Sequence, residues 1–266
     1  MKDGPEVFAV GIDSYFSSDG SQNMDTSLMF AAEDAVKFAQ NSRQYLDSNI
    51  QYLISDVRDS DIRPSRNNIL SGLQKLGSTG KAHVPGIFYF SGHGIDTEGV
   101  FSFCPTDYRP EIPSDSSISI QTVVDTYSEK YPWSLILIDA CRIAPEAGIQ
   151  QNKLNLMPRT GFTVKDNLII ITACSHGQSA LELSNVKTTK GSIFSIFFWD
   201  AVLDSLKNKQ QLSVLELFTQ IRDKVSIFTN EHFPDKPQVP CIYGPDYDRF
   251  HLISSSKLDG DCNQVG

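Results

Sequence analysis

Apolar runs bounded by turn residues recur along this chain of 266 residues. Each run is nearly free of polar positions, a pattern typical of strands that are buried on both faces of a sheet. Strands of this kind are predicted at residues 6–12, 50–54, 84–90, 133–140 and 167–173, and a last strand is expected near residues 239–243 or 249–253.

Segments with the period of a helix lie between these strands. In residues 26–47, apolar positions such as Leu28, Ala32, Val36 and Ala39 repeat every three or four residues. The alternation of strand and helix favours right-handed βαβ units, a mainly parallel sheet and a three-layer α-β-α sandwich. Further helices are predicted at residues 64–77, 117–130, 192–207 and 213–228. The segment 192–207 is apolar on most faces, and we expect it to be buried.

The length of the chain favours one domain with long loops over two domains. We predict a single domain over residues 1–253 and a polar, frayed tail over residues 254–266. Residues 142–166 are polar, contain prolines and glycines, and separate two predicted strands. This pattern indicates a long loop, and loops of this length often serve function.

Composition and charge exclude several classes of protein. The net charge is −9 and the sequence pI is near 5.0, so the basic footprint of a nucleic-acid binder is missing. We find no apolar stretch of membrane-spanning length and no signal-like amino terminus, so we expect a cytoplasmic protein without membrane partners. A cationic polypeptide would suit its charge better.

The cysteines and histidines do not form a predicted metal site or disulfide framework. Five cysteines, an odd number at irregular spacing, are expected to be reduced thiols. There is no C-x-x-C pair, and the five histidines show no H-x-x-x-H spacing, so no metal is expected.

Two reactive segments follow predicted strands directly. The strand ending at Phe90 runs into Ser-Gly-His93-Gly94, and the strand ending near Ile138 runs into Asp139-Ala-Cys141-Arg. Carboxyl ends of parallel strands converge, so His93 and Cys141 would share one crevice if their strands are neighbours. An imidazole can lower the pKa of a thiol and protonate a leaving amine, and the N–H groups of Gly94 and Cys141 could stabilise an oxyanion. Taken singly, the cysteine could be a core residue and the histidine a turn residue.

Together, the segments Tyr89–Gly94 and Asp139–Arg142 resemble the paired histidine and cysteine motifs of the caspase, paracaspase and metacaspase clan. The separation, 141 − 93 = 48 residues, agrees with the caspase signature Q-A-C-[RQG]-G and its histidine about 50 residues upstream. The resemblance covers most of the chain and implies a caspase-like fold, peptide-bond hydrolysis through the dyad of Cys141 and His93, and no cofactor. Calcium dependence would follow from family analogy only, because no feature of the sequence supports it.

The acid at position 139 departs from the caspase glutamine. In paracaspases and metacaspases the matching aspartate favours arginine or lysine before the scissile bond, and Asp34 falls at their second pocket aspartate. Two carboxylates can hold one guanidinium. Gln178 and Glu182 are expected to form a further wall. Arg142-Ile-Ala replaces the metacaspase histidine and serine-glycine, so paracaspase-like is the closer label. The alternatives are that Asp139 caps its segment or pairs with Arg142, and that Asp34 is solvated.

The loop 142–166 matches the place where caspases are cut between subunits, and it contains basic residues at Lys153, Arg159 and Lys165. Self-processing, or activation by another protease or a regulatory protein, is one hypothesis, and an unprocessed insertion is the other. By resemblance, such enzymes act on protein substrates in regulated cell death or antiviral defence.

Two rival functions stay open: an aspartate-specific protease of the same mechanism, which acids at 34 and 139 disfavour, and a catalytically silent binding module. A nucleotide-binding domain is set aside, because no glycine-rich phosphate loop follows the first strand.

Overall fold

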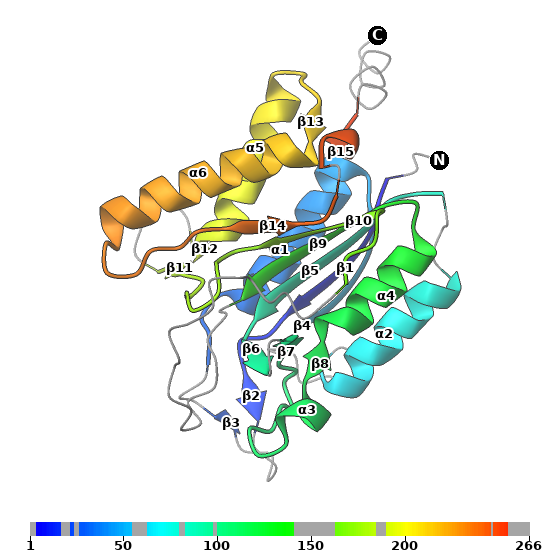
Figure 1. The fold of residues 1–266 in the computed structure, drawn as a ribbon, viewed down its shortest axis with the longest axis vertical. Coiled ribbons are helices and arrows are strands. Elements are labelled where there is room, and N and C mark those ends of the chain that lie inside the picture. The colour runs from blue at the N-terminus through cyan, green and yellow to red at the C-terminus, as the bar shows by residue number, and fades with distance from the viewer. Residues whose placement is uncertain are drawn as a thin grey trace.

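The computed structural model describes residues 4–16, 22–23, 27–54, 63–79, 83–97, 100–140, 163–184, 190–245 and 247–254. Within these ranges the chain forms an α/β sandwich built on one central sheet (Figure 1). The tail after residue 254 and residues 141–162, which include most of the predicted loop, lie outside the described residues.

The central sheet of the described residues has six strands in the order β14-β10-β9-β5-β1-β4. Five of them run parallel, and only β14 at the edge pairs antiparallel, with β10. The mainly parallel sheet predicted from the sequence is therefore confirmed. The strands are β1 (Glu6–Gly11), β4 (Asn49–Ile54), β5 (Gly86–Gly92), β9 (Ser134–Ala140), β10 (Leu168–Thr172) and β14 (Cys241–Tyr243).

Helices cover both faces of the sheet, as the three-layer prediction required (Figure 1). The first face packs against α1 (Ala31–Leu46), α5 (Ile193–Lys207) and α6 (Val214–His232). The second face packs against α2 (Arg66–Thr79) and α4 (Ile120–Lys130). Every residue of β5, β9 and β10 is buried, because each strand has a helical layer above and below it.

Alternation along β9 decides which layer each side chain enters. Leu135 and Leu137 belong to the core on the α1 side, whereas Ile136 and Ile138 belong to the core on the α4 side. Asp139 has the parity of Leu135 and Leu137. Its carboxyl group is therefore directed toward α1 and α5, which is the first step in building the site.

The boundary of α1 differs from the sequence prediction of residues 26–47. The helix begins at Ala31, and its N-cap residue Phe30 makes no side-chain capping bond. Instead, the carboxylate of Glu182 accepts the backbone N–H groups of Met29 and Phe30 at 3.1 and 3.2 Å. A cap supplied from 152 residues away in the sequence is invisible to a local pattern.

The carboxyl-terminal part contains both of the alternative last strands. β14 joins the central sheet, and β15 (His251–Ile253) pairs with β13 (Leu212–Ser213) just before α6. A 3₁₀ turn, η2 (Tyr247–Arg249), connects them. Ser213 begins α6 with a capping box, in which its hydroxyl and the Glu216 carboxylate satisfy each other's backbone N–H groups.

Short elements that the sequence analysis did not predict lie beside the carboxyl ends of the strands (Figure 1). An antiparallel sheet starts immediately after His93, and its first hairpin leads the chain back to Cys104. These elements are β2 (Tyr15–Phe16), β3 (Gln22–Asn23), β6 (Gly94–Thr97), β7 (Val100–Phe103), α3 (Pro113–Ser116), β8 (Ile118–Ser119), β11 (Glu182–Leu183) and β12 (Gly191–Ser192).

Candidate active site

The strands that carry the two predicted catalytic segments are direct neighbours. β5 and β9 pair in parallel, with Ser91 opposite Asp139 and Gly92 opposite Ala140. His93 follows β5 at this end of the sheet. Cys141, which follows Ala140 in the sequence, lies outside the described residues, so the distance between the two groups of the dyad stays untested.

The backbone of His93 is held from both sides. Its N–H donates to the hydroxyl of Tyr15 at 2.6 Å, and its carbonyl accepts the N–H of Cys104 at 3.0 Å. The Tyr15 ring also lies against the imidazole, with 4.8 Å between ring centroids. The His93 position is half-buried, and Tyr15, a residue that the sequence analysis did not single out, contacts both its backbone and its ring.

Glycine is needed at position 92 because the space beside it is filled. A Cβ there would lie 2.9 Å from Cζ of Phe90 and 3.0 Å from the Tyr15 hydroxyl. A side chain would therefore displace the group that binds the His93 N–H. Gly94 is buried and begins β6 opposite Phe103. Its role as an oxyanion donor stays a prediction.

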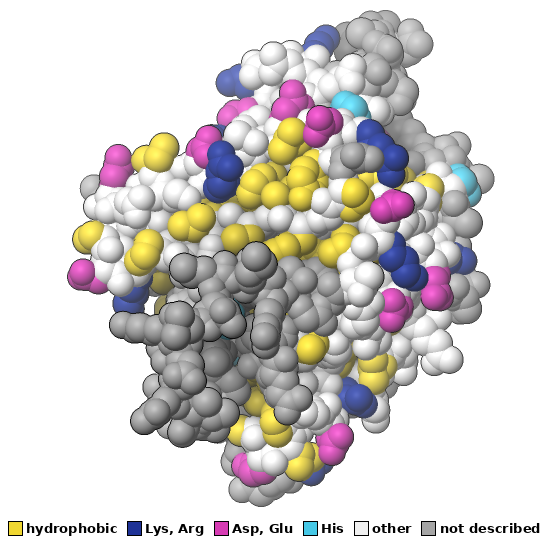
Figure 2. Space-filling model, in the orientation of Figure 1, with side chains coloured by type: hydrophobic (Ala, Val, Ile, Leu, Met, Phe, Trp, Pro, Cys, Tyr) yellow, Lys and Arg dark blue, Asp and Glu magenta, His cyan; other side chains and the backbone are white. Residues whose placement is uncertain are grey.

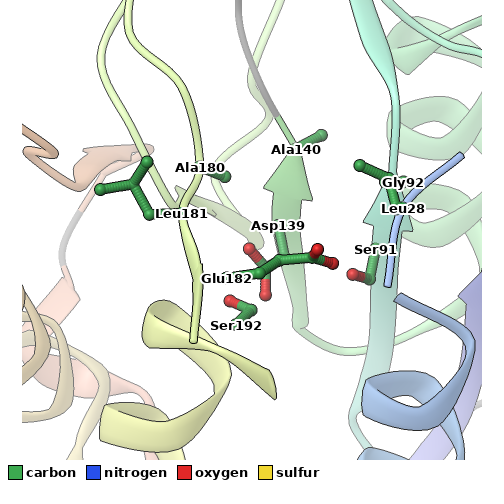
Figure 3. A pocket seen from close by; sticks show the side chains of 9 residues that line it. All are labelled: Leu28, Ser91, Gly92, Asp139, Ala140, Ala180, Leu181, Glu182 and Ser192. Atoms are coloured by element: carbon green, nitrogen blue, oxygen red, sulfur yellow. The ribbon is translucent and has the colours of Figure 1, made fainter. Parts of the chain in front are cut away.

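A pocket that is partly open to solvent lies at the ends of β5 and β9. Figure 3 shows Ser91, Asp139, Glu182 and Ser192 gathered at this edge, from four different segments. The described lining residues are Leu28, Ser91, Gly92, Asp139, Ala140, Ala180, Leu181, Glu182 and Ser192, and none of these is basic. Asp139 and Glu182 of the predicted site thus line one pocket.

Asp139 is 3% exposed, and its hydrogen-bond donors are the hydroxyl groups of two other residues. Its Oδ2 accepts the hydroxyl of Tyr89 at 3.1 Å, and the Ser192 side chain also hydrogen-bonds to it. The pKa of Asp139 is raised to about 7, mainly by burial and to a smaller extent by the charge of Glu182, while the hydrogen bonds from Ser192 and Tyr89 act in the opposite direction. Burial, and then the charges of Asp139 and Asp34, raise the pKa of Tyr89 well above its usual value, so this phenol keeps its proton.

Asp34, in the first turn of α1, is 1% exposed and lies next to Asp139. Its Oδ2 accepts the N–H of Ser192 at 2.8 Å. Burial, followed by the negative charge of Asp139, raises the pKa of Asp34 to about 8. The alternative of a solvated Asp34 is excluded by its burial. Asp34 is not among the described residues that line the pocket, and it lies behind Ser192.

Gly191 lets the backbone approach Asp34. Its φ of +136° belongs to the region that glycine tolerates, and a Cβ there would lie 2.4 Å from Oδ1 of Asp34. The next residue, Ser192, begins α5, and its hydroxyl accepts the N–H groups of Phe194 and Ser195. The helix start that places the Ser192 N–H on Asp34 therefore depends on the glycine before it.

Glu182 has a second task beside lining the pocket. Its two carboxylate oxygens accept the Met29 and Phe30 N–H groups, which directs the side chain from β11 to the start of α1. The carboxylate is therefore attached to the same helix that carries Asp34. The arrangement brings three acids, Asp34, Asp139 and Glu182, close enough that the charges of Asp139 and Glu182 both raise the pKa of Asp34.

Gln178 and the basic loop residues were also predicted from the sequence, but they are not among the described residues that line the pocket. Oε1 of Gln178 accepts the N–H groups of Ser175 and Val239 at 3.1 and 2.9 Å, and Gln178 is not among the described lining residues. Lys165 lies before β10, with its ammonium 4.0 Å from a carboxylate oxygen of Glu129. Lys153 and Arg159 lie outside the described residues. Cleavage in this loop stays a prediction.

Sequence reasoning missed Tyr15, Tyr89, Gly191 and Ser192. Tyr89 could have been found, because it stands two residues before Ser91 on a strand and shares its face. Tyr15, Gly191 and Ser192 carry no local signal, since they reach the site through long-range packing.

The described residues contain neither a cluster of metal ligands nor a helix that could cross a membrane. No group of three or more His, Cys, Asp and Glu side chains among them could hold a metal ion. No helix in the described ranges is both long and apolar enough to span a bilayer. On the face drawn in Figure 2, Lys and Arg side chains are interspersed with Asp and Glu rather than gathered in one basic patch.

Comparison with known proteins identifies a family and a fold. A model of the caspase domain matches residues 9–250. Among solved structures, the crystal structure of a protein from Geobacter sulfurreducens is similar, with a TM-score of 0.59, 14% sequence identity, and coverage of 95% of this chain and 98% of the other. At that identity the likeness shows the fold alone. None of the curated proteins matches the chain.

Proposed function

The chain belongs to the caspase domain family, whose model matches most of its length, and we propose that it is a cysteine endopeptidase that cleaves after arginine or lysine. Family membership supports cysteine peptidase activity and protein substrates at the general level. The specificity for basic residues and the roles of individual residues are our proposal, and they rest on the site described above.

In the proposed reaction, the thiolate of Cys141 attacks the scissile carbonyl and His93 protonates the leaving amine. His93 then takes a proton from water, which hydrolyses the acyl-enzyme. The N–H groups of Gly94 and Cys141 stabilise the oxyanion. The strand register supports this scheme, because Cys141 is bonded to Ala140, the partner of Gly92. Neighbouring strands lie about 4.8 Å apart, and consecutive Cα atoms lie about 3.8 Å apart. His93 and Cys141 each follow one member of the pair Gly92 and Ala140, so their backbones would be close neighbours.

One observation supports basic specificity above all: Asp139 and Glu182 line one pocket with no basic residue among its described lining, and the buried Asp34 is close enough for their charges to raise its pKa. Burial is unfavourable for the ionised forms of Asp34 and Asp139, as their raised pKa values indicate, and the charge of Lys37 opposes the shift of Asp34 only in part. A guanidinium or ammonium would supply the missing positive charge and drive both groups to ionise. An anionic aspartate side chain would find no cation among the described lining residues and would be repelled by the charge of Glu182, which disfavours the caspase-like aspartate specificity.

The test compares fluorogenic peptides that differ only at the residue before the scissile bond. We expect cleavage after arginine and lysine, little cleavage after citrulline, and none after aspartate, because citrulline keeps the shape of arginine without its charge. Cys141→Ala is the matched inactive control. Preferential cleavage after aspartate or citrulline would refute the pocket assignment, and a wild-type protein that is inert and unlabelled by an arginyl chloromethyl ketone would favour the silent binding module.

The wider role that we propose is regulated cell death or antiviral defence in the cytoplasm, by analogy with the family. Proteins with exposed basic residues would be its substrates. Incubation of the purified protein followed by mapping of new amino termini tests processing at Lys153, Arg159 and Lys165. A chain that stays intact while active would argue against activation by cleavage.

A further inference from the structure

The loop that connects β10 to the acidic pocket is tied to a distant segment of the chain. This loop, residues 173–181, contributes Ala180 and Leu181 to the pocket wall, and Glu182 follows at once. Its hydrogen bonds lead to Gln238 and Val239, which stand just before the edge strand β14. The wall of the pocket is therefore positioned by residues more than 50 positions away along the chain.

Gln238 spans the two ends of this loop with its side-chain amide. Its Nε2 donates to the carbonyl of Ala173 at 2.9 Å, and its Oε1 accepts the N–H of Leu181 at 3.0 Å. Gln238 is 0% exposed, so solvent cannot replace either partner. A buried amide whose donor and acceptor are both satisfied tolerates few other positions of the loop.

The backbone of Gln238 is anchored in turn to α6. Its N–H donates to Oγ1 of Thr229 at 3.2 Å, and its carbonyl lies 3.4 Å from the same hydroxyl, which is also fully buried. Thr229 sits on the buried face of α6, one turn after Val225. The amide of Gln238 is therefore fixed relative to the helical layer and not only to a flexible strand edge.

The middle of the same loop is hydrogen-bonded to the backbone of Val239. Oε1 of Gln178 accepts the N–H of Val239, and Oγ of Ser175 donates to the Val239 carbonyl at 3.0 Å. Gln178, predicted from the sequence as a pocket wall, thus belongs to this set of loop contacts. The other end of the wall is attached to α1 through Glu182, whose carboxylate accepts the Met29 and Phe30 N–H groups.

We propose that Gln238 is a positioning residue for the basic-residue pocket: it holds Leu181, and with it the carboxylate of Glu182, at the distance from Asp139 that a guanidinium requires. This inference rests on the proposed function. It assigns to Gln238 an effect on substrate binding, not on the chemistry at Cys141. If Gln238 merely stabilised the fold, its substitution would lower the stability of the protein without a selective effect on substrate binding.

The experiment compares Gln238→Met with Val225→Ala. Methionine keeps the length of glutamine but makes neither hydrogen bond, whereas Val225→Ala removes buried volume on the face of α6 that carries Thr229 and leaves both hydrogen bonds of the Gln238 amide in place. KM and kcat are measured with an arginyl peptide, and the rate of alkylation of Cys141 by iodoacetamide reports the dyad without using the pocket. We expect Gln238→Met to raise KM about 5- to 20-fold, as loss of one or two buried hydrogen bonds implies, with kcat and alkylation within about twofold of wild type.

The outcomes separate the inference from the function beneath it. If wild type cleaves arginyl peptides but Gln238→Met raises KM no more than Val225→Ala does, the positioning role is wrong. If wild type does not cleave such peptides, the proposed function fails and the inference fails with it. Should Gln238→Met not fold, Thr229→Val decides: it removes the anchor of Gln238 on α6, and a KM that stays at the wild-type value would overturn the proposal.

Discussion

Asp139→Asn should make the protein more stable and, at the same time, a much poorer enzyme on arginyl substrates. Asp139 is buried, and its only described partners are hydroxyl groups and other acids. Its ionised form is therefore unfavourable in the folded state. Asparagine has nearly the same shape, and its Oδ1 can still accept the hydroxyl of Tyr89, so the packing of the site should survive.

The magnitude follows from the pKa. A carboxyl group whose pKa rises from 3.8 to about 7 on folding binds its proton more tightly in the folded protein. The folded state then loses stability as pH rises between these two values, by about 2 kcal/mol at pH 5.5 and about 4 kcal/mol at pH 8.5. Asparagine does not ionise, so the variant should be more stable than wild type by these free energies. The cost of burying the neutral amide will offset part of the gain.

Urea denaturation of both proteins at pH 5.5 and pH 8.5 measures the gain, with Asp235→Asn as the control at an exposed position, where a change below about 0.5 kcal/mol is expected. For the arginyl peptide, loss of one hydrogen bond to a charged group implies a fall in kcat/KM of about 10- to 140-fold. A variant that is less stable than wild type at pH 8.5, or whose stability gain is the same at both pH values, would refute the reasoning.

Three further outcomes are expected. The Ki of a peptide that ends in arginine amide should fall about tenfold or more from pH 6 to pH 8.5, as Asp139 (pKa about 7) and Asp34 (pKa about 8) lose protons and gain charge, whereas a citrulline amide should show a flat profile. Gly191→Ala should cost about 1–3 kcal/mol in urea denaturation and weaken arginyl binding, because its Cβ would meet Asp34; Gly177→Ala, with a positive φ but nothing within 4 Å, is the control, and equal losses in both would contradict the contact argument. Tyr15→Phe should lower kcat about fivefold with KM unchanged, since it removes the acceptor of the His93 N–H, and an unchanged kcat would show that the contact is not needed.

The strands were predictable because each is buried from both sides. A continuous apolar run such as residues 133–140 leaves no polar face for solvent, and β9 indeed spans Ser134–Ala140 with every residue buried. The boundaries of the helices were less predictable from the sequence. The start of α1 depends on Glu182 rather than on residues near position 26, and both alternatives for the last strand occur, each paired with a different partner.

The candidate site divides in the same way. The positions of His93 and Asp139 at strand ends follow from the chain itself, and the pairing of Ser91 with Asp139 agrees with the expected neighbourhood of β5 and β9. The position of Gln178 could not be predicted in this way. Its Oε1 accepts the N–H of Val239, and nothing in the local sequence indicates this contact.

The sequence by itself determined the alternation of strand and helix, the layers of the fold, and the residue types available for chemistry, since these depend on local periodicity. Only the tertiary structure decided that Asp139 and Glu182 line one pocket with Asp34 buried beside them, and that Ser192, Tyr89 and Gln238 bind these acids or the pocket wall. The physical reason is that burial and hydrogen-bond partners belong to contacts between distant segments. The same carboxylate is an ordinary solvated acid on an open helix and a strongly perturbed one beneath a neighbouring strand.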